Sequence, residues 1–374
     1  MMVAKSAAGT LLLDGTPPKR LLVIVTRRIG DVLLATPVLR SIKSAWPDTG
    51  IDVLVFNGTQ GVLAGNPDID RVLTIATRPR LSTHLRFVAR SFRRYDLALS
   101  LVPGDRPTFY ALLGGRRHAG LLLDTKKESW KHPLLHAWAP YDMYETHTVL
   151  THLAGAGLLG VAPDARIRVS WTEADEKSAD VALATVAGKP YVVLHPYPKF
   201  NYKKWSTEGW LAVSEWARSR GYGVVYTGGP DKEEREYVSA LAGHVPASLN
   251  LAGQLSLGAV ARVISGAKAY VGPDTAVTHI AAALGVPCVT FFGPTDMVKW
   301  GPWPASHTAL VNPWIRFGDQ HRGNVWILQG RAACAPCNKE GCDRRVASFS
   351  DCLQMLPATA VIGALNLAVE YKND

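Results

Sequence analysis

The residues best suited to chemistry are Asp274, Thr275 and His279, which follow a short apolar segment ending at Val271. Asp and Thr are favoured helix N-caps, and the small residues of 276–284 are typical of a helix. A further apolar segment completes a β-α-β pattern. Because a helix N-terminus leaves backbone N–H groups unpaired and carries partial positive charge, this turn predicts a phosphate site. His279 lies one turn into the helix, where it could reach a ligand or be an ordinary helix residue.

Apolar segments that read as strands alternate with helical segments on either side of this motif. In the first half, strands are predicted at 21–26, 51–56, 71–75, 97–101 and 117–120, with helices at 32–46, 78–94, 106–113 and 145–159. The second half repeats the pattern, with strands at 191–195, 223–226, 249–253, 269–271 and 286–292 and helices between them. This alternation predicts an α/β fold with two doubly wound, mainly parallel sheets.

The chain length of 374 residues also favours two domains. We predict a first domain over 1–170, a linker with a helix over 171–187, and a second domain over 188–355. Residues 356–374 form a C-terminal helix that could pack back over the first domain. Two such domains would bind a ligand in the cleft between them, at the carboxyl ends of the strands.

The positive charge of the chain lies almost wholly in its first half. Residues 1–170 hold 22 Lys and Arg against 13 Asp and Glu, a net charge of +9, whereas the whole chain carries +10. Such asymmetry favours an acidic partner for the first domain, which could be an anionic membrane, a polyphosphate substrate or a nucleic acid, although a merely soluble basic face would look the same. No run of 18 apolar residues and no signal-peptide pattern occurs, so we expect a cytoplasmic protein.

Residues 124–143 break the alternation and mix basic residues with Trp130, Trp138 and Tyr141. A long loop of this composition suits a membrane surface, and a packed insertion is the alternative. Near the C-terminus the four cysteines Cys334, Cys337, Cys342 and Cys352 follow a C-x2-C-x4-C-x9-C spacing. They could hold a structural zinc ion, remain reduced thiols or form a disulfide.

Several motifs together resemble the bacterial lipopolysaccharide heptosyltransferases. The first is R-R-I-G-D-V-L-L-A-T-P-V-L-R-S-I-K at 27–43, followed by N-P-D-I-D-R-V at 66–72. The others are Y-K-K-W (202–205), T-G-G-P-D-K-E-E-R-E (227–236), L-A-G-Q-L-S-L (251–257) and V-G-P-D-T-A-V-T-H-I-A-A-A-L-G-V-P (271–287). They cover roughly residues 20–330 in the order of the family. The Y-K-K-W form is closest to the heptosyltransferase III type.

The resemblance implies a GT-B fold, with two Rossmann-like domains facing across a cleft. It implies inverting transfer of L-glycero-D-manno-heptose from ADP-heptose, bound by the second domain, to the lipid-linked inner core of lipopolysaccharide, bound by the first. It further implies that no metal ion or other cofactor is required. The expected place of action is the inner face of the inner membrane, where the enzyme would be peripheral. No nucleic-acid partner is expected.

Site residues follow from matching the motifs. Asp31 matches the family's proposed base, which takes the proton of the acceptor hydroxyl; an Asp after Gly is also an ordinary helix N-cap. Lys203 matches the phosphate-binding lysine, with Lys204 as its competitor and a solvated pair as the alternative. In the donor-site motif, Asp274 would contact a sugar hydroxyl and Thr275 the phosphates. Glu233 could hold the ribose or be a solvated residue at a helix start.

Two departures from the family bear on these assignments. Many members have Gly where Ala276 stands, and a methyl group narrows the approach to the donor phosphates. Arg28 and Ile29 replace the small polar residues that often precede Gly-Asp, so the acceptor contacts are expected to differ from those of the family. Arg27, Arg28 and Trp130 are the residues expected to contact the acceptor or the membrane.

Two other functions are compatible with the sequence. One is a GT-B transferase that uses another nucleotide sugar. The other is a non-catalytic nucleotide- or lipid-binding relative, which the presence of Asp31, Lys203 and Asp274 disfavours. A dehydrogenase is disfavoured because no G-x-G-x-x-G motif follows the first strand of either domain.

Overall fold

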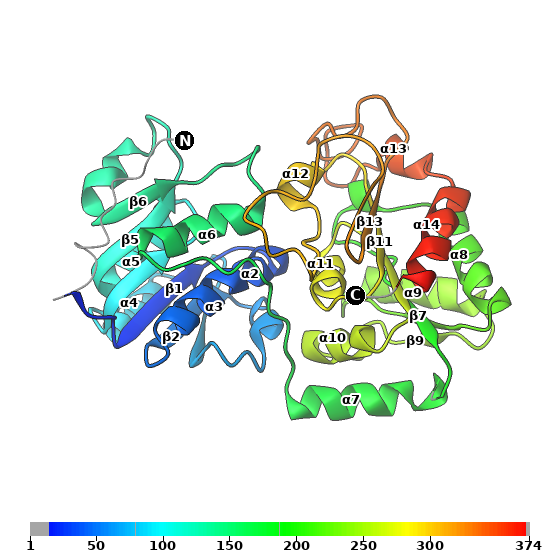
Figure 1. Cartoon of the computed structure of the whole chain (residues 1–374), viewed down its shortest axis with the longest axis horizontal. Coiled ribbons are helices and arrows are strands. Elements are labelled where there is room, and N and C mark those ends of the chain that lie inside the picture. Colours follow the sequence, from blue (N-terminus) through cyan, green and yellow to red (C-terminus); the bar gives the residue numbers. More distant parts are fainter. Residues whose placement is uncertain (1–14, 79, 187, 372–374) are drawn as a thin grey trace. The chain divides into compact units, whose positions relative to one another are not determined.

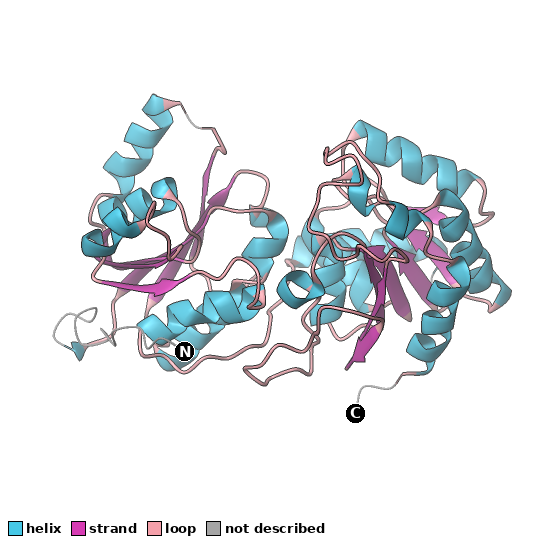
Figure 2. Cartoon of the chain, turned by 90° about the horizontal axis from the view of Figure 1, so that it is seen from above, coloured by secondary structure: helices cyan, strands magenta, loops and turns pink. Residues whose placement is uncertain are grey.

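The computed structural model describes residues 15–78, 80–186 and 188–371. The chain divides into two compact units, and each contains one sheet with helices packed on it (Figures 1 and 2). Unit 1 runs to Arg168 and includes Thr308–Val311, while unit 2 holds Val169–His307 and the chain from Asn312 onward. The break after Arg168 lies beside the boundary predicted at residue 170.

The elements of unit 1 alternate strongly between strand and helix. Its strands are β1 (Arg20–Val25), β2 (Gly50–Phe56), β3 (Arg71–Ile75), β4 (Tyr95–Ser100), β5 (Gly115–Leu122) and β6 (Ala137–Pro140). Its helices are α2 (Ile29–Leu33), α3 (Thr36–Ala45), α4 (Leu81–Ser91), α5 (Asp105–Gly114) and α6 (Thr148–Leu158), with short 3-10 turns η2 (Gln60–Leu63) and η3 (Ser129–Leu134).

In the described residues of unit 1, six parallel strands form a sheet in the order β3-β2-β1-β4-β5-β6. The strand order reverses between β1 and β4, so the crevice outside their carboxyl ends is where an open α/β sheet binds ligands. Strand β1 is buried over Leu21–Val25 because helices cover both faces of a parallel sheet, and this explains its continuous apolar sequence.

The helix predicted over 32–46 is two helices. Pro37 occupies the first turn of α3, where a proline is tolerated because that turn's N–H groups have no intrahelical partner. Helix α2 ends at Leu33, and the Leu33 carbonyl accepts a hydrogen bond from the Thr36 hydroxyl at 2.8 Å. The short helix α2 therefore carries Asp31 directly beyond the end of β1.

Unit 2 repeats the alternation. Its strands are β7 (Tyr191–Leu194), β8 (Gly223–Tyr226), β9 (Leu249–Asn250), β10 (Ala269–Pro273), β11 (Cys288–Phe292), β12 (Gln320–Arg322) and β13 (Val325–Gln329). Its helices are α7 (Glu173–Leu183), α8 (Thr207–Ser219), α9 (Lys232–Gly243), α10 (Leu257–Ser265), α11 (Ala276–Ala283), α12 (Met297–Trp300), α13 (Asp351–Gln354) and α14 (Ala358–Glu370), with 3-10 turns η4 (Ala184–Val186) and η5 (Asn201–Lys203).

Among the residues described for unit 2, the strand order is β12-β13-β11-β10-β7-β8-β9, and only β12 pairs antiparallel. The order reverses between β7 and β10, which places the loops after Leu194 and Pro273 at the ligand-binding edge. Both motifs that resemble the donor site follow these two strands.

The C-terminal helix belongs to unit 2. Its residues Val361, Leu365 and Val369 are buried in the core of that unit, and α14 packs on α8 and on strands β10, β11 and β13. The apolar face of α14 is therefore part of the unit 2 core. In the described residues, no helix is long and apolar enough to cross a membrane.

Candidate active site

Helix α11 begins directly beyond the carboxyl end of β10. Thr275 is its N-cap, with extended backbone, and the Thr275 hydroxyl accepts a hydrogen bond from the Thr278 N–H at 3.4 Å. Ala276 is the first helical residue and is half-buried. The remaining N–H groups of this first turn have no acceptor within the helix, so they face the edge where ligands bind.

Lys203 and Asp274 form an ion pair at this helix terminus. The Lys203 Nζ donates to Asp274 Oδ2, and the two side chains are only 17% and 8% exposed. Lys203 lies in the 3-10 turn η5, in the loop after β7, and Asp274 follows β10. The reversal of strand order between β7 and β10 thus brings together two residues that are far apart in the sequence.

His279 completes this group as a neutral imidazole. It is 4% exposed, and burial lowers its pKa to about 4; Asp274 opposes that shift and Lys203 adds to it. Within the described part of the chain, His279 Nδ1 is buried and has no hydrogen-bond partner. A buried polar atom without a partner is costly, so a ligand group at this position would be stabilised.

The neighbouring Lys204 has a different environment. Its ammonium lies 3.8 Å from the ring centroid of Tyr197 and 5.9 Å from that of Tyr237, which is cation–π geometry. Burial lowers its pKa, while Glu233 and Glu234 act in the opposite direction. Lys203 is thus the lysine placed at the α11 terminus, and Lys204 belongs with the aromatic and acidic residues of α9.

Glu233 and Glu234, at the start of α9, make two separate contacts. The Tyr197 hydroxyl donates to Glu233 at 3.1 Å. Burial raises the pKa of Tyr197 to about 12, and the contact with Glu233 acts in the same direction. Glu234 accepts from the Gly229 N–H at 2.6 Å, and burial raises its pKa. A Cβ atom at Gly229 would lie 2.7 Å from a carboxylate oxygen of Glu234, so a larger residue there would displace this carboxylate. Glu233 is the more exposed of the two, and it is the one predicted to meet a ribose.

His195 was not among the residues singled out from the sequence. Its N–H donates to the Val271 carbonyl at 2.9 Å, and its Nδ1 lies 3.1 Å from the Thr227 hydroxyl. It therefore links the ends of β7, β8 and β10, and burial lowers its pKa to about 4. Its position directly after an apolar strand was the only signal in the sequence. Its hydrogen-bond partners could not be predicted, because they lie on other strands.

In unit 1, Asp31 is the third residue of α2 and is 7% exposed. The N-cap is Arg28, so the interpretation of Asp31 as an N-cap is wrong, although a carboxylate in the first turn still interacts favourably with the helix dipole. Arg27 is half-buried and Arg28 is exposed.

Tyr141 is a neighbour of Asp31 that the sequence did not identify as part of a site. Burial raises the pKa of Tyr141 to about 12, with Asp31 acting in the same direction and Arg27 in the opposite one. Tyr141 directly follows β6, and its N–H donates to the Leu122 carbonyl at 2.7 Å. The predicted loop therefore supplies a residue at the carboxyl edge of the sheet, beside Asp31.

The segment 124–143 is a packed insertion rather than an open loop. It contains η3 and the sixth strand β6, which pairs with β5. Lys131 is only 1% exposed and forms ion pairs with Asp105 at 2.7 Å and Glu128 at 2.8 Å. Trp130 remains 48% exposed, so its predicted membrane contact stays a prediction.

Of the three states that the sequence left open for the C-terminal cysteines, the structure shows free thiols. Cys334, Cys337, Cys342 and Cys352 are free thiols, and no group of three or more His, Cys, Asp or Glu side chains in the described chain is placed to hold a metal ion. Burial raises the pKa of Cys352 to about 12, and the three nearby thiols act in the same direction.

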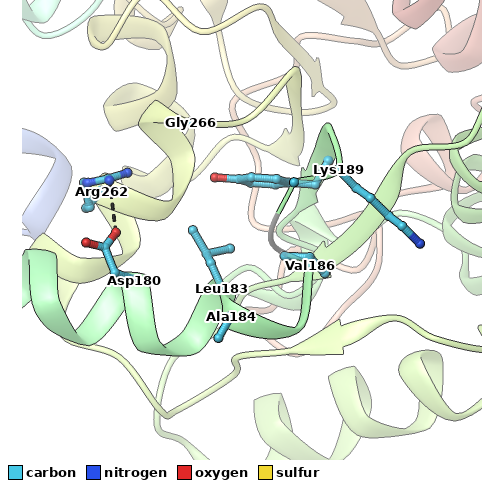
Figure 3. A pocket seen from close by; sticks show the side chains of 9 residues that line it. Asp180, Leu183, Ala184, Val186, Lys189, Arg262 and Gly266 are labelled. Carbon is cyan, nitrogen blue, oxygen red and sulfur yellow. Dashed lines mark hydrogen bonds and ion pairs between the residues drawn. The ribbon is translucent and has the colours of Figure 1, made fainter.

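A shallow hollow of about 310 Å³ lies elsewhere in unit 2 (Figure 3). It is lined by residues of α7 and α10 and by Tyr191, and Arg262 donates to Asp180 at its rim at 3.0 Å. Tyr191 is the first residue of β7, so this hollow lies at the amino edge of the sheet, opposite the α11 terminus.

The sequence and fold can be compared with known proteins. The model of glycosyltransferase family 9 (heptosyltransferase) matches residues 117–325. Lipopolysaccharide heptosyltransferase 3 of Escherichia coli is 30% identical over 289 residues, which cover 73% of this chain and 83% of that protein.

Two solved structures share the fold over nearly their whole length. A glycosyl transferase family 9 protein of Veillonella parvula DSM 2008 has a TM-score of 0.75 at 19% identity, covering 94% of this chain and 97% of that one. The E. coli ADP-heptose LPS heptosyltransferase II has a TM-score of 0.71 at 18% identity, covering 94% and 98%. The two units therefore have the GT-B fold. Because the family model matches more than half of this chain, the chain is a glycosyltransferase that belongs to family 9, the heptosyltransferases.

Proposed function

We propose that this enzyme transfers L-glycero-D-manno-heptose from ADP-heptose to the inner core of lipopolysaccharide, with inversion at the anomeric carbon. The observation that carries the proposal is the group formed by Lys203, Asp274 and His279 at the N-terminus of α11. This group offers a cation, a helix terminus and a buried neutral imidazole, which suit a diphosphate and its sugar.

The donor would be bound wholly by unit 2. The Lys203 ammonium and the first-turn N–H groups of α11, beside Thr275, would contact the diphosphate. Asp274 would accept a hydrogen bond from a heptose hydroxyl. Because Asp274 pairs with Lys203 before the donor binds, the diphosphate would share the ammonium with that carboxylate. Glu233, held by Tyr197, would accept from the ribose.

The acceptor would meet unit 1, where Asp31 lies at the end of β1. In the proposed reaction, the acceptor oxygen forms a bond to the anomeric carbon and Asp31 takes the hydroxyl proton. The bond from the anomeric carbon to the diphosphate breaks, and ADP leaves with the electron pair. Lys203 and the α11 terminus stabilise the charge that develops on ADP. Arg27 and Arg28 would contact anionic groups of the inner core.

We further infer the heptosyltransferase III type, supported by the Y-K-K-W motif and by the 30% identity to lipopolysaccharide heptosyltransferase 3. We expect transfer to proceed without a metal ion or other cofactor, as the resemblance implies; full turnover after exhaustive chelation checks this. A different nucleotide sugar is the alternative donor.

We also propose that the enzyme works as a peripheral protein on the cytoplasmic face of the inner membrane. The net charge of +9 over residues 1–170 supports an anionic surface as a partner of unit 1.

The experiment that tests the proposed reaction is a donor screen with purified enzyme and core oligosaccharide acceptors of defined length. We expect turnover with ADP-heptose and not with UDP- or GDP-sugars, and mass spectrometry should locate the added heptose. A deletion strain should lack one heptose of the core. Turnover with another nucleotide sugar alone would establish the alternative.

A further inference from the structure

The segment that contains α4 is strongly basic. Residues 78–94 contain six arginines and no Asp or Glu. Of these, Arg78 and Arg80 precede the helix, whereas Arg90, Arg93 and Arg94 lie at its end, and all five are exposed. An unbroken run of one charge is expected to bind a partner of the opposite charge.

These arginines contrast with several other arginines of unit 1 that have an acidic partner. Arg20 and Arg71 both pair with Asp52, and Arg166 pairs with Asp164. For the five exposed arginines around α4, no carboxylate among the described residues lies within ion-pair distance. Their charge is therefore not used within unit 1.

One face of α4 is used by the fold. Phe87 packs edge-on against Tyr110 of α5 with the ring centroids 5.0 Å apart, and His84 Nδ1 lies 3.1 Å from the Tyr110 hydroxyl. These contacts fix α4 beside α5 (both cyan in Figure 1) and turn the opposite face outward. The helix has 11 residues, so its two charged ends are about 16 Å apart.

The end of α4 presents an aromatic side chain among the arginines. Phe92 is 56% exposed, and the Arg93 guanidinium lies 5.9 Å from its ring centroid. The backbone is well anchored, since the Arg93 N–H donates to the Leu113 carbonyl at 2.9 Å. Arg93 has a φ of 49°, a conformation that favours Gly or Asn, so the turn itself does not require an arginine.

We propose that the α4 surface, formed by Arg78, Arg80, Arg90, Phe92, Arg93 and Arg94, docks on an anionic lipid bilayer. Charge at both ends of the helix places its axis along the membrane plane, with the guanidinium groups among lipid phosphates and Phe92 in the interface. The exposed phenylalanine favours lipid over a free phosphate, which offers it no apolar contact. This inference rests on the proposed function, which makes an anionic membrane the partner of unit 1, and it assigns that contact to the α4 surface.

Vesicle binding tests the proposal directly. Purified wild-type enzyme should co-sediment with phosphatidylethanolamine vesicles that contain phosphatidylglycerol and not with vesicles of phosphatidylcholine alone. Arg90→Gln/Arg94→Gln should weaken binding about 10- to 30-fold, and Phe92→Ser about 5-fold. Arg93 is kept, because any replacement there also tests the left-handed turn.

The matched controls remove the same groups from unit 2. Arg218→Gln/Arg220→Gln deletes two exposed arginines at the end of α8, and Phe317→Ser deletes a phenylalanine that is 63% exposed. Neither should change vesicle binding, and melting temperatures should confirm folding of all four variants. If the control arginine variant loses as much binding as the α4 variant, net charge rather than this surface is responsible, and the proposal is overturned.

A second measurement separates lipid from acceptor. With a delipidated acceptor in solution, the α4 variants should keep wild-type kcat/KM, whereas with acceptor embedded in anionic vesicles their rate should fall with their binding. An equal fall on the delipidated acceptor would mean that α4 binds core phosphates, which contradicts the proposal. Failure of the proposed function would instead appear as an inactive wild-type enzyme whose vesicle binding is intact.

Discussion

Lys203 and Lys204 are adjacent in the sequence, but their ammonium groups have different neighbours. Lys203 pairs with Asp274 at the α11 terminus, whereas Lys204 lies 3.8 Å from the centroid of the Tyr197 ring. Lys203 is the last residue of the 3-10 turn η5, whereas Lys204 follows it with extended backbone, so the two side chains point in different directions.

This separation predicts unequal effects of two similar variants. Lys203→Ala should weaken ADP binding or slow transfer by on the order of 10- to 1,000-fold, because it removes a charge-assisted phosphate contact. Lys204→Ala should matter less, since its cation–π contact supports the loop. Calorimetry with ADP on both variants is the measurement, and equal losses would contradict the assignment of Lys203.

The choice between the two lysines could not be made from sequence, because adjacency gives no direction to a side chain. Most of the parallel strands were accessible, since buried strands such as β1 are continuously apolar, whereas their order within each sheet was not. The packed structure of residues 124–143 could not be predicted, because it depends on contacts with distant residues. Lys131 forms an ion pair with Asp105 of α5, and β6 exists only through its pairing with β5. The role of Tyr141 was hidden for the same reason.

Acid should destabilise unit 2 through its buried histidines. Burial lowers the pKa of His195 and of His279 to about 4, below the value of about 6.5 in an unfolded chain. Between these values the unfolded state binds more protons than the folded state, so stability is complete above about pH 6.5 and falls as the pH drops toward 4.

The measurement is the free energy of unfolding from urea titrations at pH 7 and pH 5. His195→Gln should lower stability at pH 7 but reduce the difference between the two pH values, because one titrating group is removed. His244→Gln, at an exposed histidine after α9, is the matched control and should leave the difference unchanged. An undiminished difference in the His195 variant would contradict this origin of the acid sensitivity.

Binding of the enzyme to anionic vesicles should weaken as salt rises, because exposed charges are screened beyond about 10 Å at 0.1 M salt. Trp130, which is 48% exposed, should add to the affinity if the insertion 124–143 also meets the bilayer. Co-sedimentation of Trp130→Ala across a salt series is the test. Binding that ignores salt would rule out an electrostatic contact, and wild-type affinity in the variant would remove Trp130 from the membrane surface.

The central claim is that Asp31 takes the proton of the acceptor hydroxyl. The carboxylate lies in the first turn of α2 beside Tyr141 and is nearly buried. Asparagine keeps its size but cannot accept the proton, so the chemical step in Asp31→Asn should fall by about 100- to 10,000-fold. Stability should change by no more than about 1 kcal/mol, the usual size of a charge–dipole contact in a first helical turn. Affinity for ADP-heptose should hold, because the proposed donor residues all lie in unit 2.

The most direct measurement is therefore kcat for heptose transfer by Asp31→Asn, taken with its melting temperature and its affinity for ADP-heptose. We predict a folded variant that binds the donor normally and turns over at least about 100-fold more slowly than the wild type. Turnover near the wild-type rate would contradict the role of Asp31 and would require the base to be another group.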